Sequence, residues 1–318
     1  MFETPDYMLD ELFNNPADPE AFSDPSRLLS RLGNANWRAF QALKVGHPQQ
    51  LNFDIKDVIE DWKIQIGWIE KPWLVWSVDE DWAYVQQQLV ESVGWIPIVG
   101  YDPRKGVPTK LTSNAILVDF NRVMKLPILY MHFPLDYIHE FLPRLAFWHS
   151  DLLVRPEKMT HVADVFANLS DNEIAMCNLT KIKNPILRAL TGNGLNLKLF
   201  ELVGCINAKA SLDIQSKGLS MWQGWYYHPL CPSEEEFKKR QKWHYDHGTG
   251  LLYWMKKYGG KVKIIQESYL DEGHFSRTSK DSFKVVSPNN EGRDTGVDLK
   301  VNYDVYALAE QMNIPVTK

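Results

Sequence analysis

The spacing of hydrophobic and polar positions changes near residue 70 of the chain. Residues 55–66 place apolar side chains at the three- and four-residue intervals of an amphipathic helix, and residues 37–43 do so over a shorter stretch. Residues 1–30 are rich in Asp, Pro and Asn, which favour turns and helix starts. We therefore expect residues 1–70 to form a helical extension that precedes the main domain.

After residue 70, short apolar runs alternate with helical stretches. Residues 73–78 and 95–101 have the length of buried strands, and residues 82–93 between them have helical spacing. Strand, helix and strand at these lengths indicate a βαβ unit and a parallel sheet. The expected fold class is therefore α/β, with an open, mostly parallel sheet flanked by helices. Further strands are expected at 115–118, 128–131, 145–148 and 262–265, and further helices at 134–142, 251–258 and 303–312.

Charge and composition narrow the class of protein. The chain has 35 Lys and Arg against 40 Asp and Glu, a formal net charge of −5, which argues against a protein that coats a nucleic-acid backbone. Neither a GxGxxG motif nor a Walker A loop occurs. The 3 cysteines form no CxxC pair and suit a reducing compartment. We see no signal-peptide pattern and no apolar run of about 18 residues, so we expect a cytoplasmic protein without a membrane span.

The most informative polar positions are His149 and Asp151, which lie between the apolar runs 145–148 and 152–154. Acidic side chains are seldom fully buried without a partner. Asp151 is therefore expected either at the exposed end of a strand or beside a group that compensates its charge. Mg²⁺ or Mn²⁺ is a candidate for that group, because these ions take oxygen ligands from carboxylates, phosphates and water. Open α/β sheets bind ligands at the carboxyl ends of their strands, where Asp151 is expected to lie.

A βαβ unit followed by an apolar strand with a final Asp resembles the GT-A fold of nucleotide-sugar-dependent glycosyltransferases, over about residues 73–280. In that fold the strand is followed by an acidic triplet, the Asp-x-Asp motif, which holds a divalent cation on the diphosphate of the sugar donor. The corresponding triplet here is His149, Ser150 and Asp151. Here His149 replaces the first Asp; histidine can ligate Mn²⁺ or contact the donor, but it is a poor ligand for Mg²⁺. The resemblance implies that Asp151 and His149 bind the metal, and that Ser77 and Asp79 contact the nucleotide.

Residues 243–260 resemble the acceptor-side acidic motif of inverting GT-A enzymes, whose final carboxylate is the catalytic base. The resemblance makes Asp246 the candidate base and His247 its neighbour or substitute. A helix N-terminus stabilises an ionised carboxylate, which can take a proton from an attacking hydroxyl. The alternative is that Asp246 only caps the helix that follows it.

Residues 269–277 resemble the segment of GT-A enzymes in which a histidine completes the metal shell or touches the diphosphate. His274 takes that place, and Gly273 before it permits a close approach of the backbone. Arg277 and Lys280 would then bind phosphate. The alternative is a surface loop that carries one histidine.

Aromatic residues between these two segments are the expected acceptor site. The chain has 12 Trp, 13 Tyr and 14 Phe, and a large aromatic core is the ordinary explanation for any one of them. Side chains that alternate along a strand cannot all face one way, so we expect one or two of the cluster to face a ligand. The resemblance also places residues 204–207 in a small-residue loop near the donor sugar. The expected acceptor residues are Trp222, Trp225, Tyr227 and His228.

Three parts are thus predicted: a helical extension over 1–70, a catalytic domain over 71–280, and an extension or lid over 281–318. The expected activity is transfer of a sugar from a nucleotide-diphosphate sugar to an acceptor hydroxyl, assisted by Mn²⁺ or Mg²⁺. Inversion of the sugar carbon is expected, and retention is the alternative. A glycan is the first acceptor expected, and a lipid-linked sugar, a protein or a modified nucleobase are the alternatives.

Three other functions fit the same sequence. One is a carbohydrate-binding protein without catalysis, which the aromatic content allows. Another is a structural protein in which the triplet ending in Asp151 is a simple turn. The third is a metal-dependent hydrolase or phosphotransferase that uses His149, Asp151, His244, Asp246 and His247.

Overall fold

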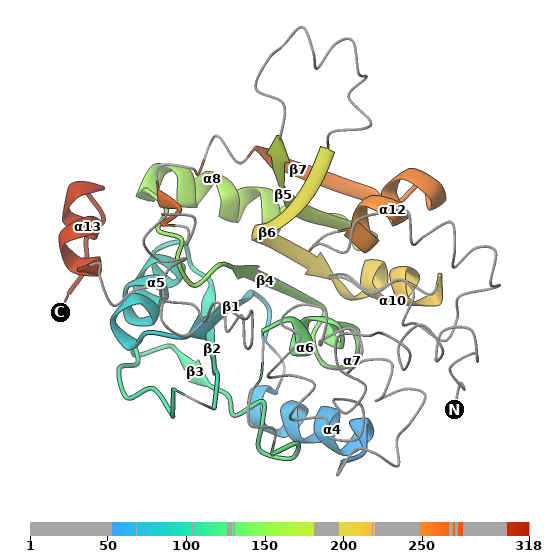
Figure 1. Ribbon diagram of the computed structural model, residues 1–318, viewed down its shortest axis with the longest axis horizontal. Helices are drawn as coiled ribbons and strands as arrows, with labels where there is room; N and C mark the ends of the chain where they lie inside the picture. Colours follow the sequence, from blue (N-terminus) through green and yellow to red (C-terminus); the bar gives the residue numbers. More distant parts are fainter. Residues whose placement is uncertain are drawn as a thin grey trace, which may run out of the picture.

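A central sheet organises the part of the chain that a computed structural model describes (Figure 1). Its seven strands lie in the order β3-β2-β1-β4-β6-β5-β7. The strands are β1 (Pro72–Ser77), β2 (Ile96–Tyr101), β3 (Ile116–Leu117), β4 (Arg144–Trp148), β5 (Glu173–Thr180), β6 (Leu197–Asn207) and β7 (Lys261–Gln266). The described residues are 53–67, 69–103, 105–125, 129, 131–180, 197–217, 219, 249–266, 270, 273–275 and 304–317.

Strand directions confirm the mostly parallel sheet. β1 pairs in parallel with β2 and with β4, β2 pairs in parallel with β3, and β5 pairs in parallel with β7. β6 lies between β4 and β5 and is antiparallel to both. Every strand except β6 therefore runs in one direction, and the carboxyl ends of β1, β2 and β4 meet at the same edge of the sheet.

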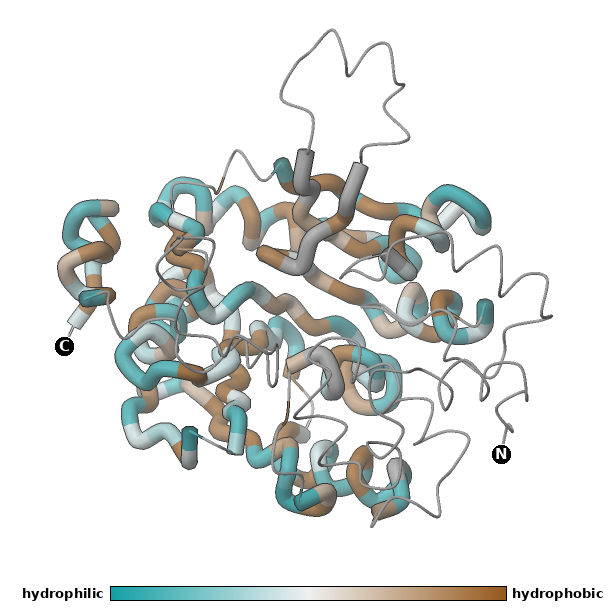
Figure 2. The backbone as a smooth tube through the Cα atoms, viewed as in Figure 1, coloured by the Kyte–Doolittle hydropathy of each residue, from teal (hydrophilic) through white to brown (hydrophobic). Residues whose placement is uncertain are grey.

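Helices cover both faces of the sheet. All six residues of β1 are buried, and alternate side chains enter two separate cores: Leu74 and Trp76 face one, Trp73 and Val75 the other. The first core contains side chains of α4 (Ile55–Ile66), α10 (Ala208–Ser216) and α12 (Thr249–Tyr258). The second contains side chains of α5 (Glu80–Ser92), α8 (Pro156–Ala167) and α13 (Val305–Gln311). Figure 2 shows the strands as mainly hydrophobic and the helices as alternating between hydrophobic and hydrophilic positions.

Local sequence explains where several helices begin. Asp54 and Asp79 cap α4 and α5 by accepting a hydrogen bond from a backbone N–H of the first turn, and Asp304 does the same for α13. Pro156 is the first residue of α8. Proline lacks a backbone N–H, and an N–H at this position would have no hydrogen-bond partner within the helix. Within the described residues, every helix is too short or too polar to cross a membrane.

Eight predicted elements are confirmed. The helices are those expected at 55–66 (α4), 82–93 (α5), 251–258 (α12) and 303–312 (α13), and the strands are those expected at 73–78 (β1), 95–101 (β2), 145–148 (β4) and 262–265 (β7). The strand at 115–118 is reduced to the two residues of β3. The helix at 134–142 is divided into α6 (His132–Leu135) and α7 (Ile138–Phe141). The helix expected at 37–43 lies outside the described residues, and the division into three parts stays a prediction.

One expected strand lies only partly within the described residues, and one expectation from the resemblance, the loop at 204–207, is wrong. Of the strand expected at 128–131, the two described residues, Leu129 and Met131, lie outside the strands of the sheet and are buried in the first core. Residues 204–207 are not a loop but the buried end of β6. Gly204 is required there because a side chain would meet the ring of Phe147 and the carbonyl of Ala175.

Glu80 at the start of α5 holds the backbone of the loop after β2. Its carboxylate accepts hydrogen bonds from the Thr109 hydroxyl and from the Lys110 N–H, both at 2.7 Å, and the first of these does most to lower the pKa of Glu80. A carboxyl whose pKa is lower in the folded state stabilises the fold at pH values above its ordinary pKa of 4.5. That stabilisation is lost as the pH falls through the folded-state pKa.

Replacing Glu80 by glutamine is therefore expected to lower the free energy of unfolding by about 1 kcal/mol at about pH 7. The difference between variant and parent should shrink at about pH 3, where more of the parent carboxyl is protonated than at about pH 7. Urea unfolding of both proteins at both pH values measures this effect. A loss of the same size at both pH values would show that the charge of Glu80 contributes nothing.

Candidate metal centre

The turn after β4 carries the first two residues of the site. The N–H of His149 still bonds to the carbonyl of Leu202 in β6 at 2.9 Å, so His149 continues the sheet by one residue. The N–H of Leu152 then bonds back to the carbonyl of His149 at 3.2 Å. This tight turn places Asp151 at the carboxyl edge of the sheet, as the sequence predicts.

A short segment that follows β7 lies beside this turn. The N–H of Leu153 bonds to the carbonyl of Gly273 at 2.9 Å, and the N–H of Phe275 bonds to the carbonyl of Asp151 at 3.0 Å. Leu152 and His274 form an antiparallel bridge between these bonds. The backbone itself therefore brings His274 to Asp151 from more than 100 positions along the chain.

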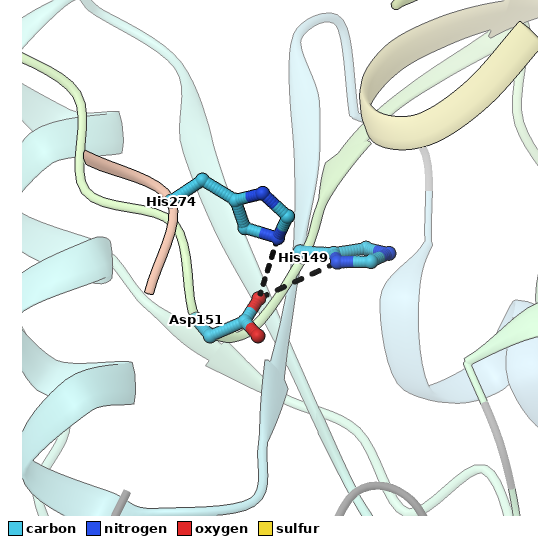
Figure 3. A group of neighbouring side chains, drawn as sticks. All are labelled: His149, Asp151 and His274. Atoms are coloured by element: carbon cyan, nitrogen blue, oxygen red, sulfur yellow. Dashed lines mark ion pairs between the residues drawn. The ribbon is translucent and has the colours of Figure 1, made fainter. Parts of the chain in front are cut away.

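Three side chains converge at this point (Figure 3). Oδ1 of Asp151 lies 3.4 Å from Nδ1 of His149 and 3.8 Å from Nε2 of His274. The two imidazole rings are 5.7 Å apart and inclined by 66°. One ligand atom from each residue lies within 4.8 Å of the others, so the group could hold a metal ion. The prediction that these residues meet is confirmed by this geometry.

Burial and charge suit the group to a cation. Asp151 is 5% exposed, and the side chains of His149 and His274 are 23% and 11% exposed. A carboxylate so little exposed requires compensating partners, which the two imidazoles or a bound cation can supply. Two nitrogen ligands and one oxygen ligand fit Mn²⁺ and later transition metals better than Mg²⁺, which prefers oxygen alone.

The predicted nucleotide-binding residues lie at the same edge but have structural roles as well. Ser77 is the last residue of β1, is 4% exposed and pairs with Tyr101. Asp79 caps α5 by accepting a hydrogen bond from the N–H of Trp82 at 3.1 Å. Their contact with a nucleotide stays a prediction.

Several predicted site residues lie outside the described residues. For the base, α12 begins at Thr249, so the helix expected after Asp246 is present. The roles of the other residues stay predictions. The residues concerned are Asp246, His247, Trp222, Trp225, Tyr227, His228, Arg277 and Lys280.

Two buried polar residues near this edge were not singled out from the sequence. Asp102 directly follows β2 and is 2% exposed. Asp102 could have been found in the sequence by the same feature as Asp151, because both are acidic residues at the end of an apolar run. Gln86 in α5 is 0% exposed and donates hydrogen bonds to the turn after β4. No local pattern distinguishes Gln86 from its glutamine neighbours, Gln87 and Gln88.

Comparison with known proteins gives no match to a family model, to a curated protein or to a solved structure. The function of the chain is therefore inferred from its own residues and their geometry.

Proposed function

We propose that this protein is a metal-assisted glycosyltransferase that moves a sugar from a nucleoside-diphosphate sugar to an acceptor hydroxyl. The observation that carries the proposal is the approach of His274 to Asp151 and His149 at the carboxyl end of β4. Open α/β sheets bind ligands at this edge, where the ends of several parallel strands meet. The strand order with β6 alone reversed is compatible with a GT-A sheet.

The charge of the centre supports a diphosphate ligand. With neutral imidazoles, Asp151 is the one charged residue among the three, so a divalent cation would leave the centre with a net charge of about +1. A centre with two carboxylates would instead be neutral. A bound cation would neutralise the charge that develops on a leaving diphosphate. The replacement of the first acidic residue of the triplet by His149 is therefore consistent with binding an anion.

The remaining roles follow the predictions from the sequence. In our proposal Ser77 and Asp79 bind the nucleoside. The parallel pairing of β1 with β4, which brings the ends of both strands to one edge, supports this role. Asp246, just before α12, takes the proton from the acceptor hydroxyl in our proposal, and the attack inverts the sugar carbon. The aromatic residues near Trp222 bind the acceptor.

A second function is favoured by the ligand set alone. Two histidines and one carboxylate are also the ligands of non-haem iron(II) oxygenases. Such an enzyme would bind Fe²⁺ with no requirement for a nucleotide. The metal and nucleotide preferences of the protein therefore separate the two functions.

A thermal-shift panel tests the proposal. The melting temperature is measured with Mn²⁺, Mg²⁺ or anaerobic Fe²⁺, each with and without uridine or guanosine diphosphate. We expect Mn²⁺ with one nucleoside diphosphate to raise the melting temperature by about 5 °C at ligand concentrations about 100-fold above Kd. Stabilisation by Fe²⁺ that no nucleotide increases would favour the oxygenase. The absence of any stabilisation by metal with nucleotide would contradict the glycosyltransferase proposal.

A further inference from the structure

Gln86 binds the turn that carries the candidate metal ligands. The side chain is 0% exposed and projects from α5 toward the end of β4. Its amide Nε2 donates to the carbonyl of His149 at 2.8 Å and to the carbonyl of Leu152 at 2.9 Å. These two carbonyls stand at either end of the turn, with Asp151 between them.

The amide supplements the backbone hydrogen bond of the turn, in which the His149 carbonyl accepts from the N–H of Leu152 at 3.2 Å. Buried backbone carbonyls require hydrogen-bond donors, and a strand that ends loses the partners that its neighbours in the sheet supply. A glutamine amide offers two N–H donors on one planar group, which can satisfy two carbonyls at once. The pair of bonds therefore fixes the separation of the His149 and Leu152 carbonyls, and with it the path of the backbone through Asp151.

The same helix also contacts the other half of the centre. Trp82, one turn before Gln86 in α5, packs edge-on against Phe275 with ring centroids 5.6 Å apart. Phe275 follows His274 and bonds through its N–H to the carbonyl of Asp151. Residues four apart lie on one face of a helix, so a single face of α5 holds both backbone segments.

We propose that Gln86 is a positioning residue of the metal centre, which aligns His149 and Asp151 for the cation without touching it. This inference rests on the proposed metal centre and adds the element that sets its geometry. Residues that orient metal ligands typically change metal affinity by about 10–100-fold when they are replaced.

The next residue of the helix provides a matched control. Gln87 is also 0% exposed, and its amide also makes two hydrogen bonds to a backbone segment. Nε2 donates to the carbonyl of Lys110 at 3.2 Å, and Oε1 accepts from the N–H of Thr112 at 2.9 Å. Gln87 therefore matches Gln86 in residue type, burial and helix, but holds the loop after β2 and not the turn after β4.

Gln86→Met and Gln87→Met each remove a buried amide at nearly constant volume. For both variants we would measure the melting temperature without metal, and the Kd for Mn²⁺ by calorimetric titration at a temperature where the proteins are folded. Both substitutions are expected to lower the melting temperature. Only Gln86→Met is expected to raise the Kd, by about 10–100-fold, with Gln87→Met within about twofold of the parent.

An unchanged Kd in Gln86→Met, or an equal rise in both variants, would overturn the positioning role. Gln86→Asn serves if Gln86→Met fails to fold, because it keeps a buried amide that is too short to reach both carbonyls. It should weaken Mn²⁺ binding by about tenfold, and binding at the parent level would again overturn the role. Failure of the unaltered protein to bind Mn²⁺ would refute the centre itself, which distinguishes the two failures.

Discussion

Replacement of Asp151 by asparagine is expected to abolish Mn²⁺ binding and sugar transfer while the protein stays folded. Asparagine has nearly the same shape but no charge, so it removes the one carboxylate of the three converging side chains. A neutral amide in a site that is 5% exposed carries no penalty for a buried charge, so folding should tolerate it. Because even residues that only orient metal ligands change affinity by up to about 100-fold, we expect a larger loss here.

Calorimetric titration with Mn²⁺ measures this loss, and the melting temperature without metal reports on folding. Asp171→Asn is the control, because Asp171 is a surface carboxylate that pairs with Lys209, and exposed ion pairs contribute little to stability. That variant should bind Mn²⁺ as the parent does. Parent-level binding by Asp151→Asn would instead remove Asp151 from the metal centre.

Gly273→Ala is expected to damage the centre from its other side. A methyl group on Gly273 would overlap the carbonyl oxygen of Leu153 and would lie 2.9 Å from a methyl carbon of Met312. The segment that carries His274 must therefore move away from the turn that carries Asp151. We expect a loss of about 1–3 kcal/mol in the free energy of unfolding, together with at least about tenfold weaker Mn²⁺ binding.

Gly100→Ala separates loss of stability from loss of the site. A methyl group on Gly100 in β2 would lie 2.6 Å from the ring of Trp76, so the substitution also overfills a packed region. It should destabilise the protein without changing the Kd for Mn²⁺. Denaturant unfolding and metal titration of both variants give the comparison. If Gly273→Ala keeps the parent affinity, the bridge between Leu152 and His274 does not set the geometry of the site.

The sequence predicts those parts of the fold that local pattern determines. The apolar run before His149 gives β4, and the interruption by Asp151 marks the end of the strand. β6 could not be predicted, because its place between β4 and β5 depends on pairing between distant segments. The resemblance to GT-A enzymes predicts a loop at Gly204, but this residue lies in β6, where its lack of a side chain leaves room for the ring of Phe147.

The same limit applies within the site. The resemblance to GT-A enzymes predicts that His274 approaches Asp151, but no property of the intervening sequence does. Gln86, Gln87 and Gln88 look alike as polar positions of one helix, yet they bind the turn after β4, the loop after β2 and the backbone of Thr317. Which glutamine serves the metal centre depends on which carbonyls the fold leaves beside it.

Anomalous diffraction from crystals grown with Mn²⁺ and a nucleoside diphosphate tests the central claim most directly. We predict one manganese peak within coordination distance of His149, Asp151 and His274, with the diphosphate bound to the same ion. A manganese ion elsewhere, or a diphosphate bound away from these three side chains, would contradict the account.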